Sequence, residues 1–419
     1  MLAKDAQYLT VRYSQRDMHN ASLDRLSDEA MRKESFDCLV SQDGDSQAYD
    51  SSGYDSSGDW SQEKIYHLPS ERSRNKKRWL RVLIVLVPLL VVLGGTIALA
   101  AQASTSTQAI EKPKGPKVAF ATLLTFDPEK AVNETDINDD PYFVATRMLG
   151  YQLLHDPVTK NRLDAPLIVM AAPNTSEAKI DRLERDGLTI FRITDPIDPP
   201  LYRDYDTKHF IGVWNKLEIW RWTQYDRVIF VDSDHLLIKP LDEILQETET
   251  QVYQNKRLVQ TPADEGEQPS EYLFAPSPEL KMGDYATGGN HFPPTKDEYN
   301  PGDHGEGYIN SGLFVIKPDL KMFDYFMSVM SQPNKFDSTY PEQNLFNYVF
   351  RPDGNLPWKM LDVKWSTHFP TMNAVKGGAH AVHEKWWMDW LEPAFMNWMV
   401  SWRWRMEGYY TAWDSLMQH

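Results

Sequence analysis

The chain has 419 residues, and its 60 acidic residues outweigh its 44 basic ones, giving a formal net charge of −16. Proteins that bind nucleic acid need a basic surface, so this balance argues against nucleic acid as a partner. At ~150 residues per domain, the length allows two or three domains. The single cysteine, Cys38, excludes an intramolecular disulfide. That absence is typical of the cytosol and equally compatible with a lumenal enzyme that is stable without disulfides.

The first 81 residues predict a disordered cytoplasmic tail. They are polar and contain a Ser/Asp/Gly-rich stretch with a tandem five-residue repeat, Y-D-S-S-G at 49–53 and again at 54–58. Such a stretch buries too little apolar surface to offset the entropy lost on ordering.

A membrane span is predicted next. A basic cluster at 72–81 precedes residues 82–101, a run of 20 residues without a charge. At ~1.5 Å per residue this run spans about 30 Å, the thickness of a bilayer's hydrocarbon core. A cleaved signal peptide is the alternative, but the run begins some 80 residues into the chain. The positive-inside rule then predicts a single-pass type II protein with everything after 101 beyond the cytoplasm. Residues 102–117, rich in Ser, Thr, Gln, Lys and Pro, form a stalk.

The globular part opens with alternating strands and helices. Apolar runs predict strands at 118–125, 167–172, 188–193 and 228–231, and apolar spacing predicts helices at 141–154, 176–185 and 213–224. This order favours an α/β fold with a parallel, doubly wound sheet. No G-x-G-x-x-G or Walker sequence follows the first strand, which disfavours dinucleotide and P-loop chemistry.

The second half is less regular. Residues 260–307 are rich in Pro, Gly and acidic side chains and predict a long functional loop. A strand at 309–316, helices at 320–331 and 342–350, and short strands near 360–363 and 380–383 are expected to follow. The Trp-rich segment 386–413 predicts a C-terminal helix that covers the sheet's edge or the base of the domain.

The strand at 228–231 ends in D-S-D, so Asp232 and Asp234 lie where the chain leaves the sheet. Ligands of open α/β sheets collect at the carboxyl ends of the strands. Two carboxylates one residue apart can share a hard divalent cation whose remaining positions go to water and substrate phosphates. A solvated turn is the alternative interpretation of any isolated D-x-D. The buried strand before it favours a metal–diphosphate site.

Several blocks together resemble the glycogenin-like glycosyltransferase family 8. They are A-F-A-T-L-L-T at 119–125, the block at 214–234 that ends in F-V-D-S-D, Y-I-N-S-G at 308–312, P-E-Q at 341–343 and V-H-E-K-W at 382–386. The resemblance covers residues 118–390, with 391–419 as a Trp-rich C-terminal extension. It implies a GT-A fold, a UDP-sugar donor, retaining transfer, and Mn²⁺ as the cofactor.

The resemblance also implies roles for single residues. Asp232, Asp234 and His383 match the metal ligands. Lys216, Asn310, Gly312, Tyr142 and Lys385 match or lie at positions that contact the donor. Glu342 and Gln343 match the Asp-Gln pair beneath the reacting sugar carbon. From the residues alone, His383 is equally a packed core histidine, and Lys216 is equally a lysine whose apolar stem is buried while its amine reaches solvent.

The sequence departs from the family at three places. The family's D-Q-G is Glu342-Gln343-Asn344 here, which lengthens the acid by one methylene and puts a nucleophilic role for Glu342 in question. The family's Lys-Pro-Trp is replaced by Lys385-Trp386-Trp387, and 260–307 is longer than in glycogenin.

The favoured function is a membrane-anchored, Mn²⁺-dependent retaining hexosyl- or N-acetylhexosaminyltransferase. It acts on a glycan or glycoprotein acceptor in the Golgi lumen. One alternative is a self-glucosylating primer enzyme like glycogenin. The other is a non-catalytic anchored protein that binds sugar nucleotides or glycans, which two intact aspartates in D-S-D argue against.

Overall fold

The computed structural model describes residues 115–125, 136–203, 212–285, 288–302, 307–388 and 391–417. All of them belong to one compact unit, which spans Thr107–His419. The predicted tail at 1–81 and the predicted membrane span at 82–101 lie outside the described residues. No helix in the described part of the chain is both long and apolar enough to cross a membrane.

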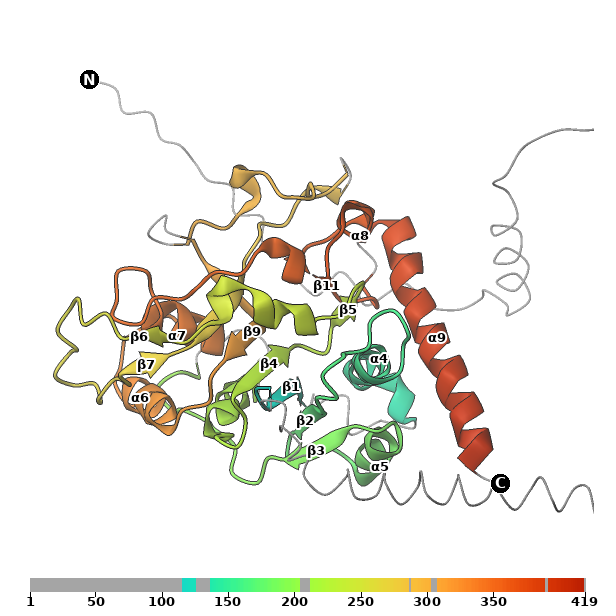
Figure 1. Ribbon diagram of the computed structural model, residues 1–419, viewed down its shortest axis with the longest axis horizontal. Coiled ribbons are helices and arrows are strands. Elements are labelled where there is room, and N and C mark those ends of the chain that lie inside the picture. Colours follow the sequence, from blue (N-terminus) through green and yellow to red (C-terminus); the bar gives the residue numbers. More distant parts are fainter. Residues whose placement is uncertain are drawn as a thin grey trace, which may run out of the picture. The chain divides into compact units, whose positions relative to one another are not determined.

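A six-stranded sheet forms the centre of the fold, in the order β3-β2-β1-β4-β9-β8 (Figure 1). Its strands are β1 (Val118–Leu124), β2 (Leu167–Ala171), β3 (Thr189–Arg192), β4 (Arg227–Val231), β8 (Phe274–Pro278) and β9 (Ile309–Ile316). The first four run parallel, as the alternation of elements predicts. β9 runs antiparallel to β4, and β8 runs antiparallel to β9, so the sheet is mixed and the expectation of a parallel sheet is wrong at this side.

β8 corrects a second expectation, because it lies inside the segment predicted to be a loop. Pro276 and Pro278 hide the strand in the sequence, since proline donates no ladder hydrogen bond and is usually found in edge strands. Among the described residues, β8 is the last strand on its side of the sheet, next to β9, and on its other side the Phe274 and Pro276 carbonyls accept from Lys359 N and Leu361 N. The same segment also holds β7 (Glu271–Tyr272), which pairs with β6 (Tyr253–Gln254), and a 3-10 turn, η8 (Lys296–Glu298).

Both faces of the sheet are covered, as in a doubly wound fold. Alternate residues of β4 enter different cores: Val228 and Phe230 pack with η4 (Val213–Arg221), α6 (Leu320–Met330) and α7 (Pro341–Val349). Ile229 and Val231 pack with α4 (Pro141–Leu154) and α5 (Glu177–Arg185). Strands buried on both faces carry continuous apolar runs, which is the pattern that the sequence shows at 228–231.

The helix predicted at 213–224 is the 3-10 helix η4 instead. Trp214, Leu217 and Trp220 recur every three residues, and all three are buried. A 3-10 helix has three residues per turn and places such residues on one side, whereas an α-helix would spread them. The strand expected near 360–363 is also wrong, since a 3-10 turn, η9 (Val363–Trp365), precedes β10 (Thr367–His368).

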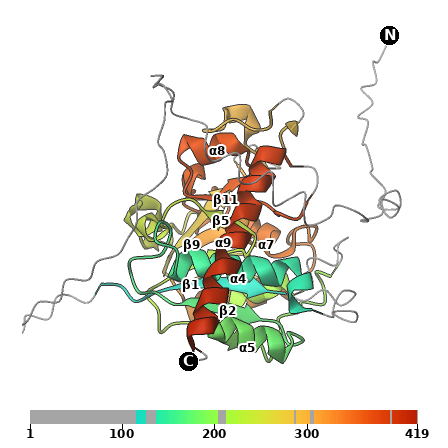
Figure 2. The same ribbon diagram turned by 90° about the vertical axis from the view of Figure 1, so that its right-hand side faces the viewer.

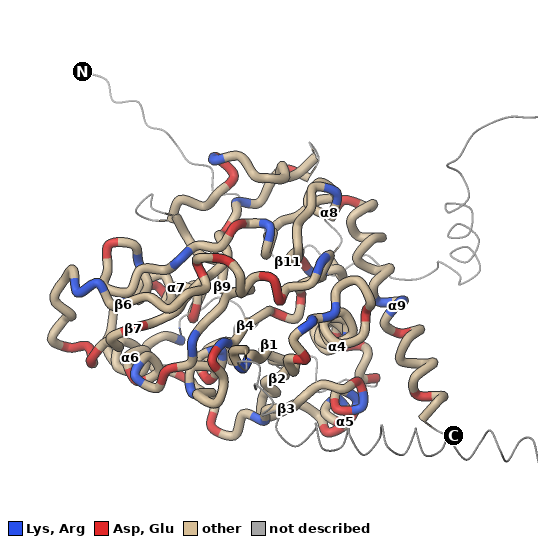
Figure 3. The backbone as a smooth tube through the Cα atoms, viewed as in Figure 1, with Lys and Arg blue, Asp and Glu red and all other residues tan. Residues whose placement is uncertain are grey.

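α4 and α5 are joined by ion pairs. α5 carries residues of both charges (Figure 3), and Lys179 Nζ lies 2.8 Å from the carboxylate of Asp140, the N-cap of α4. From α4, Arg147 Nε bonds Asp186 at the end of α5, at 2.6 Å. These contacts fix the first turn of α4, which faces the functional site.

The C-terminal helix α9 (Pro393–Met417) packs across α4 rather than over the sheet's edge (Figure 2). Phe395, Met399, Trp402 and Met406 of α9 share a core with Val144 and Met148 of α4. Arg405 also forms an ion pair with the buried Asp156 at 2.9 Å. The same core includes α8 (Met372–Gly377) through Ala374.

Candidate active site

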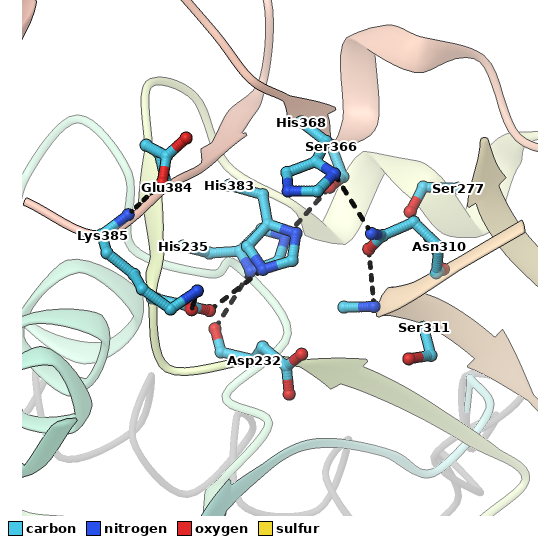
Figure 4. Close-up of polar contacts among 12 residues, drawn as sticks. Asp232, His235, Ser277, Asn310, Ser311, Ser366, His368, His383, Glu384 and Lys385 are labelled. Carbon is cyan, nitrogen blue, oxygen red and sulfur yellow. Dashed lines mark hydrogen bonds and ion pairs between the residues drawn. The ribbon is translucent and has the colours of Figure 1, made fainter. Parts of the chain in front are cut away.

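A small three-stranded sheet stands beyond the carboxyl end of β4. It consists of β10, β11 (Ala381–His383) and β5 (His235–Leu237), in that order. β5 begins one residue after Asp234. Its register pairs His235 with His383, and His383 with His368 on the other side. The three imidazoles therefore stack in a row, with ring centres 4.2 and 4.9 Å apart (Figure 4).

Asp234 is brought against His383 and Lys385. Its carboxylate lies 3.1 Å from His383 Nε2 and 3.1 Å from Lys385 Nζ, and the side chain is buried. Burial alone would raise the pKa of Asp234, but the positive charges of Lys385 and His383 outweigh it and hold this pKa well below its usual value. Burial likewise opposes protonation of His383, yet the Asp234 carboxylate raises the pKa of His383 above its ordinary value.

Asp232 faces a different partner. Its carboxylate lies 3.0 Å from Lys216 Nζ, which also contacts Glu342 Oε1 at 2.9 Å and the Ser311 carbonyl at 3.2 Å. Lys216 is 4% exposed, so its amine does not reach solvent, which excludes the alternative interpretation of a solvent-reaching lysine. Burial, only partly offset by Lys216, raises the pKa of Asp232 to about 6, and nearby Asp234 adds to the rise. The two aspartates thus differ in charge environment.

The N-S-G sequence at the start of β9 lies beside this pair. Asp232 N donates to the Gly312 carbonyl at 2.7 Å, so β9 is joined to the D-S-D turn. A Cβ on Gly312 would stand 2.4 Å from His383 Cε1, which explains why a residue without a side chain lies here. Asn310 Oδ1 accepts from Gly312 N at 2.8 Å and holds the turn closed.

The Glu342-Gln343 pair begins α7 and bonds the same turn. Ser311 Oγ donates to Glu342 Oε1 at 2.8 Å, and Ser311 N donates to Gln343 Oε1 at 2.9 Å. Both side chains are buried. The predicted donor-site residues of β9 and α7 are therefore directly connected.

Tyr142 lies in the first turn of α4, on the same side as the aspartates. Its ring meets Trp387 edge to face, with centres 4.9 Å apart. Burial raises the pKa of Tyr142 to about 12, with a smaller opposing effect from Lys385. Tyr142, Trp387 and Lys385 together form an aromatic and cationic wall next to Asp234.

Two histidines and one glutamate of this site are not among the residues that the sequence predicts. His235 directly follows D-S-D and was visible there, but its role depends on cross-strand pairing. Glu279 and His368, which pair through Glu279 Oε1 and His368 Nδ1, gave no signal: Glu279 lies in the segment read as a loop, and His368 in a strand that was not predicted.

A divalent cation fits the donor set at this site. Asp234, His235 and His383 have ligand atoms within 4.8 Å of one another. His235 is engaged through both nitrogens, by the Asp232 carbonyl at 3.1 Å and Ser366 Oγ at 2.9 Å, so it is the poorest ligand of the three. In the described structure, Asp234 Oδ1 is buried without a hydrogen-bond partner even though His383 Nε2 is near. A carboxylate oxygen and an imidazole nitrogen placed in this way suit a shared cation.

Comparison with known proteins places the chain near enzymes that transfer sugars. No protein-family model matches it. It is 28% identical over 290 residues to an uncharacterized protein of Schizosaccharomyces pombe, covering 63% of this chain and 72% of that protein. A protein of Arabidopsis thaliana provisionally named a glucuronosyltransferase is 33% identical over 134 residues, covering 31% of this chain and 24% of that protein. Galactinol synthase 5 of the same plant is 23% identical over 187 residues, covering 44% and 52%.

Solved glycosyltransferase structures also match. Mouse xyloside xylosyltransferase 1 is 15% identical, with 64% of this chain and 97% of that one covered, at a TM-score of 0.39. The galactosyltransferase LgtC is 14% identical, with 70% and 95% covered, at a TM-score of 0.38. Similarity at this level leaves the function to be argued from the site.

Proposed function

We propose that this chain is a retaining, Mn²⁺-dependent glycosyltransferase that moves a hexose-type sugar from a UDP-sugar to a glycan or glycoprotein acceptor. The observation that carries the proposal is the contact between Asp234 and His383 at the carboxyl end of β4. Asp234 and His383 are far apart in the sequence, and in the fold they lie close enough to be ligands of one divalent cation. The similarity to galactinol synthase and to the plant protein named a glucuronosyltransferase supports sugar transfer in general.

The metal would be held by Asp232, Asp234 and His383, and when bound it would neutralise the negative charge that grows on the departing diphosphate. Lys385, which contacts Asp234, adds a second positive charge on the same side. Tyr142 and Trp387 next to it offer ring faces and edges to a uracil base.

Asn310 and Gln343 bind and orient the donor sugar through their amides. Glu342 is suited to holding Lys216 rather than to attacking the sugar. Its Oε1 already accepts from Lys216 and Ser311, and an oxygen engaged in two hydrogen bonds is a weaker nucleophile. Lys216 in turn fixes the carboxylate of Asp232.

The proposal includes a cellular location and a membrane topology for the enzyme. The uncharged run at 82–101 behind a basic cluster supports a single-pass type II anchor in the Golgi membrane, with residues 118–390 on the lumenal side. That topology has its own test, given in the Discussion.

The function is tested by release of UDP from a panel of UDP-sugars with Mn²⁺, using the full-length chain. We expect turnover of at least one UDP-sugar, and a loss of at least about 100-fold in Asp234→Asn, which keeps the shape but removes the charge. Asp353→Asn is the matched control because the Asp353 side chain is 72% exposed. Turnover by Asp234→Asn equal to that of the parent, with an unchanged unfolding temperature, would refute the proposal.

A further inference from the structure

A buried carboxylate that no part of the proposed chemistry uses lies at the end of β8. Glu279 is 8% exposed. Its Oε2 accepts from Asn310 Nδ2 at 2.8 Å and from Gln343 Nε2 at 3.4 Å, and its Oε1 pairs with His368 Nδ1. A buried charge is expensive unless it is paired and hydrogen-bonded, and Glu279 meets that requirement only by holding these three side chains.

Glu279 orients both amides of the predicted donor-sugar site. Each amide is held at its two ends: the nitrogen donates to Glu279, while the oxygen accepts from the backbone of the N-S-G turn. An amide nitrogen carries two hydrogens, so each has a second N–H beyond the one given to Glu279, and the Asn310 nitrogen also lies 3.5 Å from His368 Nδ1. Figure 4 shows the side chain of Asn310 pointing toward His368, above Ser311. The cluster thus offers N–H donors together with a carboxylate acceptor, which are the partners of sugar hydroxyl groups.

The charges around this cluster are negative or already paired. Glu279 and Glu342 are its acids. Among the described residues that contact the site, Lys216 is bound by Asp232 and Glu342, Lys385 and His383 by Asp234, and His368 by Glu279. Burial acts against the charge on Glu279, yet His368 and Asn310 lower the pKa of this carboxyl below its ordinary value, so it is ionised at neutral pH. Apart from the proposed metal itself, a sugar that carried its own carboxylate would lie beside the carboxylates of Glu279 and Glu342, and the cationic side chains described around it are already in ion pairs.

We propose that Glu279, held by His368, is the residue that sets donor specificity, and that it selects an uncharged hexose over the corresponding uronic acid. This inference rests on the proposed function, because it assumes that Asn310 and Gln343 face the donor sugar. It assigns to β8 a role in the donor site.

The test uses the full-length chain with Mn²⁺ and two matched donor pairs. UDP-glucose and UDP-glucuronate differ only at C6, as do UDP-galactose and UDP-galacturonate. For each pair we measure kcat/KM for UDP release and the Kd of the intact donor. We expect the neutral member to be favoured at least tenfold in at least one pair. Equal or better use of the uronate members would overturn the proposal while leaving the glycosyltransferase function standing.

Substitutions at Glu279 then test whether this residue causes the preference for the neutral donor. Glu279→Gln should reduce the preference for the neutral donor at least threefold, measured as the neutral-to-uronate ratio of kcat/KM and as the uronate-to-neutral ratio of Kd, while the Kd of UDP itself stays within twofold. Glu279→Asp keeps the charge and should keep the preference. Glu267→Gln is the control from the same segment, since the Glu267 side chain is 83% exposed. A general folding defect would weaken both members of a pair equally. An unchanged ratio in Glu279→Gln would therefore remove Glu279 from donor selection.

Failure of the underlying function gives a different result. If the parent binds neither UDP nor any of the four donors and releases no UDP, then the proposed function fails, and the inference fails with it. Binding of UDP with no preference between the paired sugars rejects only the inference. If Glu279→Gln does not fold, as judged by thermal unfolding, the ratios of the parent and of Glu279→Asp still decide.

Discussion

Asp232 and Asp234 look equivalent in the sequence but differ in the folded chain. Asp234 is held by His383 and Lys385, which lower its pKa, whereas Asp232 is held by Lys216 and has its pKa raised to about 6 by burial. The buried ammonium of Lys216 contacts both the Asp232 and the Glu342 carboxylates, and removing either carboxylate would leave its charge less well compensated. Lys216 therefore links the D-S-D turn to Glu342, and the two aspartates are expected to contribute differently to binding a cation.

His383→Ala is expected to weaken dependence on the metal more than recognition of the sugar. The substitution removes the nitrogen that faces Asp234 Oδ1 at 3.1 Å but leaves the Asn310 and Gln343 amides in place. We expect the Mn²⁺ concentration for half-activity to rise at least about tenfold, while KM for the UDP-sugar changes less. His291→Ala is the control, since the His291 side chain is 73% exposed. An unchanged Mn²⁺ requirement would make His383 a packing residue only.

Gly312→Ala tests the close approach between β9 and β11. The added Cβ would stand 2.4 Å from His383 Cε1 and 2.7 Å from His383 Nδ1, so the ring must shift. We expect the activity to fall about tenfold or more and the Mn²⁺ requirement to rise. Gly408→Ala in α9 meets no atom within 4 Å and should be stabilising by ~0.5–1 kcal/mol, because alanine favours a helix. Activity of Gly312→Ala equal to that of Gly408→Ala would show that the ring has room to move.

At the scale of elements, the segment between β7 and β9 combines two structures. β8 belongs to the central sheet, and Glu279, the residue that follows it, lies at the site. Beyond it the chain leaves the sheet and returns at a neighbouring point: Lys281 N donates to the Glu298 carbonyl at 2.8 Å, and Asn300 N to the Glu279 carbonyl at 3.0 Å. Removing all of 260–307 would therefore destroy the sheet's edge, whereas removing only the excursion at 282–297 would not.

We expect replacement of residues 282–297 by two glycines to separate donor from acceptor chemistry. Glu279 and Asn310 remain, so UDP release without acceptor should stay within about threefold of the parent. Loops on a rigid scaffold commonly carry recognition, so transfer to the acceptor should fall at least about tenfold. Both rates are measured with one UDP-sugar.

The excursion also packs on α8, where a Cβ on Gly377 would meet Phe292 at 2.4 Å. Phe292→Ala in the full-length chain therefore measures the loss of packing alone. If the replacement lowers both rates equally while Phe292→Ala lowers neither, the excursion builds the donor site.

For the whole molecule, the proposed type II membrane topology can be tested at the N-glycosylation sequons. Asn133-Glu134-Thr135 and Asn174-Thr175-Ser176 are N-glycosylation sequons after the predicted span, and Asn20-Ala21-Ser22 lies before it. Asn174 is exposed in the turn between β2 and α5, where a glycan has room. Asn20 and Asn133 lie outside the described residues.

If the type II topology is right, only Asn133 and Asn174 can carry glycans. The chain expressed in a eukaryotic secretory pathway should lose mass on treatment with an endoglycosidase, and Asn133→Gln combined with Asn174→Gln should abolish that loss. Asn20→Gln should leave it unchanged. A mass loss abolished by Asn20→Gln alone would reverse the topology and with it the lumenal assignment.

Local pattern was enough to predict the positions of the strands and helices from residue 118 to residue 231, although the helix expected at 213–224 is of the 3-10 type. The helix expected at 141–154 is α4, and the apolar run 228–231 lies in the buried strand β4. The position of D-S-D at a strand's carboxyl end follows from the same run, because the periodicity and length of an element are written in consecutive residues. The candidate ligands Asp232, Asp234 and His383 came from local motifs and a family resemblance, and the folded chain brings Asp234 and His383 into contact.

Tertiary structure alone decided the strand directions and the second half of the site. The antiparallel course of β9 and β8 depends on long-range pairing, which no local period encodes. Pro276 and Pro278 made β8 hard to predict, because proline cannot donate a ladder hydrogen bond. The loss of that bond is tolerated in an edge strand, but the sequence does not show which strand lies at the edge of the sheet. For that reason Glu279 gave no signal. The row formed by His235, His383 and His368 arises from the register of three short strands. A strand was expected near 380–383, where β11 lies, whereas β5 and β10 are too short to show a pattern of their own.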